Sequence, residues 1–168
     1  MLECPAAMGF AMNRRTSMSE VGLSEWFQMI GNWTYTILTN KFVALTLGGA
    51  VGTHARYWLS RWFNELAWTR GFPLGTFAVN VAGSFILGLA AVVILERLPP
   101  SQQGWYLLIG AGFCGGFTTF STFEWETFKL VRDGNITFAL LNIVGSVLVG
   151  FLGVVLAVVL MGLVFPRR

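Results

Sequence analysis

The chain has 168 residues, of which 55% are hydrophobic and only 11% carry a charged side chain. In soluble domains about a quarter of all residues are charged, so a compact soluble protein with this composition would lack the polar surface it needs. The formal net charge is +3, and the charged residues lie between apolar runs without forming a basic face. Composition therefore indicates one domain embedded in a membrane, and it argues against nucleic acid as a partner.

Residues 1–40 form an N-terminal arm with a pattern of their own. Arg14 and Arg15 are followed by polar residues with Glu20 and Glu25, where a secretory signal would have its apolar core, so we expect the arm to be retained. Apolar side chains then recur at helical spacing on one face: Leu23, Trp26, Phe27, Ile30 and Trp33. Two interpretations stay open, an interfacial amphipathic helix and a poorly ordered arm whose aromatic residues only mark the membrane interface.

The remaining chain, residues 41–168, contains four apolar segments of the length that crosses a bilayer, which is about 20 residues for a helix. We expect transmembrane helices over residues 42–59, 75–95, 105–123 and 136–165. The connections carry charged and turn-forming residues: Arg61 to Phe72, Pro99-Pro100, and Asp133-Gly134-Asn135. The sequence thus predicts an all-α integral membrane protein with a four-helix transmembrane domain.

Positive charges are divided almost equally between the two sides of this predicted domain. Only charges within about 15–20 residues of a span weigh strongly on orientation, which removes Arg14 and Arg15 from the tally. The side of the termini then has four: Lys41, Arg97, Arg167 and Arg168. The other side has five: Arg56, Arg61, Arg70, Lys129 and Arg132. Chance in a small sample explains this tie, and so does dual topology, in which chains insert in both orientations and pair antiparallel.

Polar side chains inside the spans are functional candidates, because a buried polar group in a bilayer needs a partner. Thr76, Asn80 and Ser84 follow one face of the second predicted helix at i, i+4 and i+8. Asn142 and Ser146 repeat this spacing in the fourth. For Ser84 and Asn142 we expect hydrogen bonds between helices that hold the bundle together.

Carboxylates are missing from the first, second and fourth predicted spans, and Glu124 and Glu126 follow the third. A small proton-coupled exporter needs an acid within the membrane, and cation pathways are usually lined by carboxylates or carbonyls. Amides and hydroxyls donate hydrogen bonds to anions instead. Arg56 either attracts anions to a vestibule or extends its side chain to the interface.

The most specific pattern is residues 115–123, GGFTTFSTF, where two glycines and four hydroxyl residues interrupt an apolar helix. Such a sequence suits a broken helix, whose freed carbonyls must be satisfied by protein, water or an ion. Phe120 and Phe123 stand at i and i+3, with Ser121 and Thr122 between them. Taken alone, a phenylalanine pair at this spacing is usually packing surface.

This stretch, followed by Glu126, resembles the signature of the Fluc-type fluoride channels of the CrcB family. The resemblance extends in order over about residues 42–165. The matching positions are Gly48-Gly49-Ala50-Val51-Gly52, Arg56-Tyr57, Pro73-Leu74-Gly75-Thr76, Asn80, Gly83-Ser84, Gly88 and Ser146. The chain departs from the family at Asn142, where aromatic residues can occur.

The resemblance implies a homodimer of two inverted subunits in the inner (plasma) membrane, surrounded by lipid, with two antiparallel pores that conduct fluoride passively out of the cytoplasm. It implies a channel and not an enzyme. The fluoride pathway would be lined by Asn80, Phe120, Ser121, Thr122, Phe123 and Ser146. Arg56 would attract anions at a vestibule, and the carbonyls of Gly115 and Thr118 would hold a structural Na⁺ that is not transported.

Two other functions stay open from the residues alone. A small dual-topology exporter would share the size and the four spans, but it needs the carboxylate that the predicted spans lack. A non-transport membrane assembly subunit would use the polar stripes only for helix packing.

Overall fold

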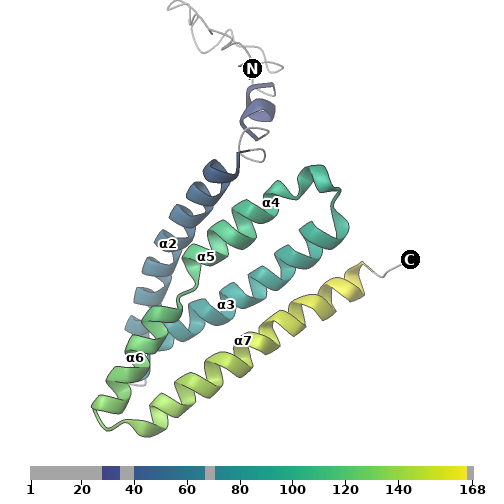
Figure 1. The fold of residues 1–168 in the computed structure, drawn as a ribbon. Helices are drawn as coiled ribbons and strands as arrows, with labels where there is room; N and C mark the ends of the chain where they lie inside the picture. Colours follow the sequence, from purple (N-terminus) through teal and green to yellow (C-terminus); the bar gives the residue numbers. More distant parts are fainter. Residues whose placement is uncertain (1–27, 35–39, 67–70, 166–168) are drawn as a thin grey trace, which may run out of the picture. The chain divides into compact units, whose positions relative to one another are not determined.

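The computed structural model describes residues 28–34, 40–66 and 71–165 (Figure 1). These ranges contain helices, turns and short extended stretches, with no strand among them. The chain divides into two compact units, Met1–Tyr35 and Thr36–Arg168.

In the first unit, residues 28–34 are helical. Three apolar side chains of this helix, Met29, Ile30 and Trp33, are exposed. The helix contains part of the amphipathic pattern found in the sequence, whereas Leu23, Trp26 and Phe27 lie outside the described residues. An interfacial location for this segment stays a prediction.

The second unit is built from helices that follow one another closely. In chain order they are α2 (Lys41–Leu66), α3 (Leu74–Ala90), η1 (Ala91–Arg97), η2 (Pro100–Gln102), α4 (Gly104–Tyr106), η3 (Leu107–Cys114), α5 (Gly115–Phe117), α6 (Phe120–Arg132) and α7 (Ile136–Val164). The segments η1 and η3 have π-helical turns, and η2 is a 3₁₀ turn. A turn at Gly134, whose φ is 78°, separates α6 from α7. Glycine adopts this left-handed conformation at no steric cost.

Among the described residues, three helical segments are long and apolar enough to cross a membrane: Leu74–Arg97, Pro100–Arg132 and Ile136–Val164. They cover the second, third and fourth predicted spans, so the chain is an all-α membrane protein. The first predicted span lies in α2, a helix of 26 residues. Its second half carries His54, Arg56 and Arg61, so α2 is less apolar than the three spanning segments.

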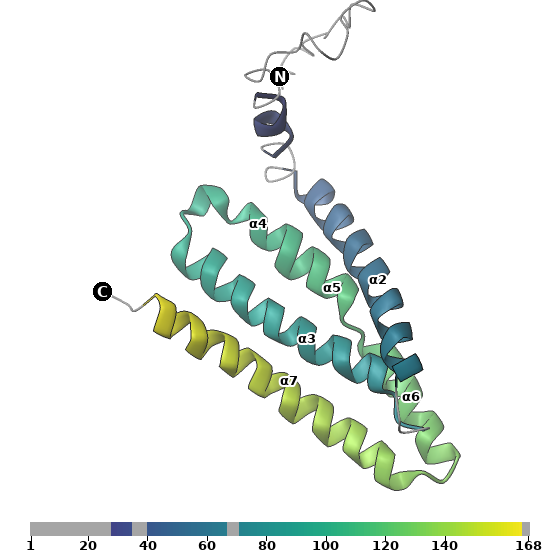
Figure 2. The ribbon, with the colours of Figure 1, turned by 180° about the vertical axis from the view of Figure 1, so that it is seen from behind.

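Helix α3 lies between α7 on one side and the helical path from α4 to α5 on the other (Figures 1 and 2). Helix α2 packs against η3, α5 and α3. Helix α7 is the most exposed of the spans, with only 11% of its most apolar window buried. In a membrane protein we expect lipid or another subunit to cover such a face.

Glycines let α2 approach the third segment closely. A Cβ atom on Gly48 would overlap the carbonyl of Leu108, and one on Gly112 would lie 3.1 Å from the Cα of Gly48. A Cβ on Gly116 would lie 2.5 Å from the carbonyl of Gly49. Only glycine fits at such backbone contacts, which are typical of packing between membrane helices.

Two helices extend beyond the ends that the sequence predicted. Helix α2 continues to Leu66, so Arg61 is helical and pairs with Glu65 at 3.0 Å instead of starting a loop. Helix α6 continues to Arg132, so Glu124 and Glu126 belong to the third spanning segment and do not follow it. The prediction was wrong at both places because charged residues suggested loops, whereas a helix can carry charges, as in the exposed i,i+4 pair of Arg61 and Glu65.

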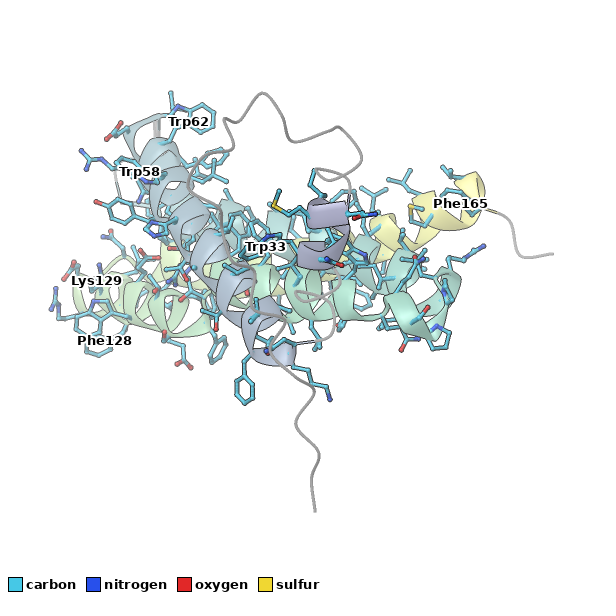
Figure 3. All side chains as sticks on the ribbon, turned by 90° about the horizontal axis from the view of Figure 1, so that it is seen from above. Trp33, Trp58, Trp62, Phe128, Lys129 and Phe165 are labelled. Atoms are coloured by element: carbon cyan, nitrogen blue, oxygen red, sulfur yellow. The ribbon has the colours of Figure 1, made fainter. Side chains whose placement is uncertain are left out.

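Aromatic side chains gather at one end of the second unit. Trp58 and Trp62 project outward from α2, and Phe128 lies beside Lys129 in α6, while Phe165 lies at the opposite end (Figure 3). All four aromatic side chains are more than half exposed. Aromatic and basic side chains concentrate where a membrane meets water, so we expect an interface at each of these ends.

Candidate functional site

The third spanning segment is interrupted at Thr118 and Thr119, which we call the break. Helix α5 ends at Phe117; Thr118 (φ −86°, ψ 159°) and Thr119 (φ −151°, ψ 116°) are extended; and α6 begins at Phe120. Extended residues cannot continue the helical hydrogen-bond ladder. Inside a bilayer, the backbone groups released there need other partners.

Asn80 of α3 supplies the partners of one extended residue. The backbone N–H of Thr119 donates to Asn80 Oδ1 at 2.8 Å, and Asn80 Nδ2 donates to the carbonyl of Thr119 at 3.1 Å. A side-chain amide offers a donor and an acceptor in one plane, so it pairs with a peptide unit in two hydrogen bonds. Because Nδ2 has a second hydrogen, Asn80 can still donate to a further acceptor.

The two threonines of the break also end one helix and start the next. Thr118 donates to the carbonyl of Cys114 through both its backbone N–H and its hydroxyl, each at 2.9 Å. The Thr119 hydroxyl accepts the backbone N–H of Thr122 at 3.3 Å and donates to the Thr122 hydroxyl at 2.9 Å. Thr119 is therefore the N-cap of α6, and the Thr122 hydroxyl keeps its own hydrogen for another acceptor.

The hydrogen bonds at the break leave the carbonyls of Gly115 and Thr118 without their usual helical donors. In a continuous α-helix, the N–H of Thr119 would donate to Gly115 and the N–H of Thr122 would donate to Thr118. Both N–H groups donate to side chains instead. Gly115 faces open space, since an added Cβ would meet nothing within 4 Å. The carbonyls of Gly115 and Thr118, which the family resemblance implies as Na⁺ ligands, thus lack the N–H donors that a continuous helix would give them.

In the described part of the chain, no group of three or more His, Cys, Asp or Glu side chains gathers that could hold a metal ion. Carbonyl oxygens are ligands for alkali cations. The residues at the break therefore fit a cation held by backbone oxygens.

Phe120 and Phe123 lie on the first turn of α6, directly after the break. Their ring centroids are 5.8 Å apart. Phe120 is 70% exposed, whereas Phe123 is only 9% exposed. The two predicted pathway rings are therefore neighbours, but within one chain only Phe120 is open to the surroundings.

Two grooves meet at the break. The Asn80 groove, of about 460 Å³, is lined by Asn80, Ser84, Gly115, Thr118, Thr119, Phe120 and six other residues. The Arg56 groove, of about 620 Å³, is lined by Arg56, Arg61, Thr76, Thr119, Thr122, Glu126 and five other residues. Thr119 belongs to both. The break and its Asn80 clamp therefore lie between two grooves on the surface of the unit, and each groove contains amide, hydroxyl or charged side chains among apolar ones.

The predicted site residues divide into four groups. Asn80, Gly115, Thr118 and Phe120 line the Asn80 groove, while Arg56 and Thr122 line the Arg56 groove. Phe123 lies beneath Phe120, and Ser121 is exposed next to it. Ser146 lies on α7 and donates to Asn142 Oδ1 at 3.5 Å.

The two interhelical hydrogen bonds expected from the sequence have different outcomes. Asn142 Nδ2 donates to the Thr127 hydroxyl at 2.8 Å, which joins α7 to α6 as expected. Ser84 donates instead to the carbonyl of Asn80 at 2.8 Å, within α3, so the expectation for Ser84 is wrong. A serine hydroxyl reaches the carbonyl four residues back in its own helix without any help from packing.

Sequence reasoning missed Thr119 as the partner of Asn80, and it missed that Glu126 lies within the third span. Thr76 is buried, and Glu126 has a buried Oε2 without a hydrogen-bond partner. Thr122 and Glu126 are four residues apart and so share a face of α6, which is a signal that the sequence did contain. The presence of Glu126 in the third span also removes the argument that an exporter would lack a membrane carboxylate.

The fold and the site define a helical membrane protein whose interrupted helix is clamped by an amide between two grooves. Residues 43–158 match the family model described as CrcB-like protein, Camphor Resistance (CrcB). The chain belongs to this family.

Several relatives carry the name Fluoride-specific ion channel FluC. The chain is 43% identical to that of Solibacter usitatus over 128 residues, which are 76% of this chain and 99% of the relative. It is 44% identical to that of Acidobacterium capsulatum over 71% of this chain and 94% of the relative. For Pyrococcus furiosus the identity is 48%, over 68% of this chain and 94% of the relative.

Proposed function

We propose that the chain is a fluoride-selective channel that lets fluoride leave the cytoplasm passively across the inner (plasma) membrane. The observation that carries this proposal is the break clamped by Asn80, in a chain whose relatives are named as fluoride channels. Fluoride is small and strongly hydrated, so a pathway must replace its water with good hydrogen-bond donors. The break assembles such donors between two grooves.

The pathway would run from the Arg56 groove past the break to the two rings of α6. Arg56 raises the local concentration of anions where the groove opens. Donors along the way are the remaining Nδ2 hydrogen of Asn80 and the hydroxyls of Ser121 and Thr122, with Ser146 further along α7. The edges of Phe120 and Phe123 carry partial positive charge and can face an anion.

A dimer of inverted copies would complete this pathway. We infer that α2 crosses the membrane as the fourth span, because its 26 residues exceed the length that a bilayer needs. The near-equal charge tally of four against five supports insertion in both orientations. The Asn80 groove and the exposed Phe120 ring lie in a membrane span of the single chain, where a second copy would cover them.

A structural Na⁺ fits the same arrangement. The released carbonyls of Gly115 and Thr118 would come from each of the two copies, and they fit a cation that prefers oxygen ligands. When bound, Na⁺ would offset the partial negative charge of these oxygens. The chain's own contribution is the clamp, since Asn80 and the Thr119 hydroxyl divert the donors that would otherwise occupy the two carbonyls.

The proposal can be tested in cells that lack a fluoride exporter of their own. Expression of this chain should restore growth in fluoride medium and lower the fluoride content of the cells. A matched strain expressing the Asn80→Asp variant should stay sensitive. Equal sensitivity with and without the parent chain, at verified expression in the membrane, would contradict the proposal.

A further inference from the structure

Asn142 is a fully buried amide on α7, the most exposed of the three apolar spanning segments. Its exposed fraction is 0%, although α7 has most of its apolar surface open. Burying an amide in an apolar environment is costly unless its donor and acceptor are bonded. The structural role of Asn142 therefore follows from the groups to which its side-chain donor and acceptor are hydrogen-bonded.

Asn142 is the middle of a hydrogen-bond chain that ends at Phe123. Ser146 Oγ donates to Asn142 Oδ1 at 3.5 Å, and Asn142 Nδ2 donates to Thr127 Oγ1 at 2.8 Å. Thr127 Oγ1 in turn donates to the backbone carbonyl of Phe123 at 2.8 Å. This series of hydrogen bonds joins Ser146 of α7 to Phe123 of α6, and both are residues of the proposed fluoride pathway.

The direction of these bonds follows from the donors available. A threonine hydroxyl has one hydrogen, and that of Thr127 is used on the carbonyl of Phe123. Thr127 can then only accept from Asn142, so the amide must present Nδ2 to Thr127 and Oδ1 to Ser146. The 3.5 Å bond from Ser146 is at the limit of hydrogen bonding, so its hydroxyl can turn to another acceptor while the Asn142–Thr127 pair stays in place.

We propose that Asn142 is a positioning residue for anion conduction: through Thr127 it fixes the turn of α6 that carries Phe123, and so places the Phe123 ring beside Phe120. Asn142 itself is sealed from the pathway. The proposal rests on the proposed fluoride conduction. It also explains why an amide can stand at this position of α7, since a phenyl ring there would have no donor for Thr127.

Two substitutions each remove a different hydrogen-bonding side chain of the series from Ser146 to Phe123. Asn142→Leu keeps a similar volume and removes the donor, and Thr127→Val keeps the shape and removes the hydroxyl. Thr137→Val, on an exposed position of α7, is the matched control. Each variant and the double variant would be purified, checked for assembly and reconstituted, and the fluoride efflux rate and the fluoride-to-chloride permeability ratio would be measured.

We expect each single variant to assemble, to lose about tenfold in fluoride efflux, which corresponds to ~1.4 kcal/mol of barrier, and to lose selectivity over chloride. The double variant should be no worse than the worse single variant, because both act through one chain of bonds. Thr137→Val should match the parent. Parent-like efflux and selectivity in both single variants, or losses that multiply in the double variant, would overturn the positioning role.

A second measurement reads the ring directly and does not need conduction. With 4-fluorophenylalanine at position 123, the ¹⁹F resonance should shift or broaden in Asn142→Leu and in Thr127→Val, and stay unchanged in Thr137→Val. An unchanged resonance in both variants, or failure of both variants to assemble, would overturn the proposal. A parent that does not conduct fluoride would instead contradict the proposed function, and the ¹⁹F result would still decide the placement of the ring.

Discussion

The side-chain amide of Asn80 and the backbone of Thr119 form a two-bond pair, with N–H to Oδ1 at 2.8 Å and Nδ2 to the carbonyl at 3.1 Å. The pair ties α3 to the point where the third span is interrupted. Because the amide replaces the partners that a continuous helix would supply, Asn80 is a structural clamp as well as a candidate fluoride donor. A substitution at Asn80 therefore tests two roles at once.

Asn80→Asp should lower both stability and fluoride flux. The carboxylate can still accept from the N–H of Thr119, but its other oxygen faces the carbonyl of Thr119 without a hydrogen to donate. A buried acceptor left in this way costs about 1–3 kcal/mol, and a negative charge beside the pathway repels the anion. Thermal unfolding of the purified protein and fluoride efflux from liposomes would be measured together.

Ser84→Ala is the matched control for Asn80. It removes only the hydroxyl bond to the Asn80 carbonyl inside α3, so we expect a loss of about 1 kcal/mol or less and nearly unchanged flux. Parent-like stability and flux in Asn80→Asp would show that Asn80 neither clamps the break nor serves the anion.

Phe120→Ile should abolish most fluoride flux while the protein stays folded. The ring is 70% exposed in the single chain, so its loss disturbs little packing within the subunit. Isoleucine fills comparable space without the positive ring edge that can face an anion. Efflux from liposomes, at equal protein and with thermal unfolding measured alongside, gives the result.

Phe123→Ile should also lower flux, but it is a less clean test, because Phe123 is buried and its loss affects packing too. Phe128→Ile is the control for both, since Phe128 is exposed and stacks on Trp125 with centroids 5.8 Å apart, away from the break. If Phe120→Ile and Phe128→Ile conduct equally well, the assignment of Phe120 to the pathway fails.

Gly115→Val should disrupt assembly of the dimer and leave the single chain folded. The residue is helical, with φ −63°, and a Cβ there would meet nothing within 4 Å in the subunit. A second copy over the Asn80 groove would meet the new side chain. Light scattering after size exclusion, in a detergent that preserves the parent dimer, would detect the change from dimer to monomer.

Gly48→Val provides the contrast, because a Cβ at Gly48 overlaps the carbonyl of Leu108 within the subunit. That variant should fail to fold as well as to assemble. A Gly115→Val dimer as stable as the parent would place the second copy elsewhere, and it would also withdraw the two-copy Na⁺ site.

Dual insertion should be visible by labelling at Gln102, an exposed residue of the 3₁₀ turn η2. We expect Gln102→Cys, in a chain whose Cys4 and Cys114 are replaced, to react with an impermeant thiol reagent from both faces of the membrane. The reason is the near-equal tally of positive charges on the two sides. Labelling from one face only, in sealed vesicles of verified orientation, would exclude inverted pairing.

The sequence was sufficient for the class of protein and for most helix positions. The starts of α3 and α7, at Leu74 and Ile136, lie within one residue of the predicted spans, because Pro73 and the Asp133-Gly134-Asn135 turn mark them clearly. The ends of α2 and α6 were predicted too early, at residues 59 and 123, because charges on an exposed helix face resemble a loop in the sequence.

The sequence singled out the residues of the candidate site but could not indicate the hydrogen bonds between them. The stripe of Thr76, Asn80 and Ser84 drew attention to Asn80, but its partner Thr119 is 39 positions away, so no local pattern could indicate the clamp. Likewise, the bond from Asn142 to Thr127 depends on how α6 turns back onto α7. Contacts of this kind come from the tertiary fold, whereas spacing along one helix reports only a shared face.

The most direct test of the account is fluoride efflux from liposomes that contain the purified protein and potassium fluoride, read with a fluoride electrode. A passive channel moves charge, so release should begin when valinomycin lets potassium follow. It should far exceed release from empty liposomes, and it should not depend on a sodium gradient. Chloride-loaded liposomes should release little. Fluoride release no faster than from empty liposomes, or fluoride driven uphill by an imposed sodium gradient, would contradict the account.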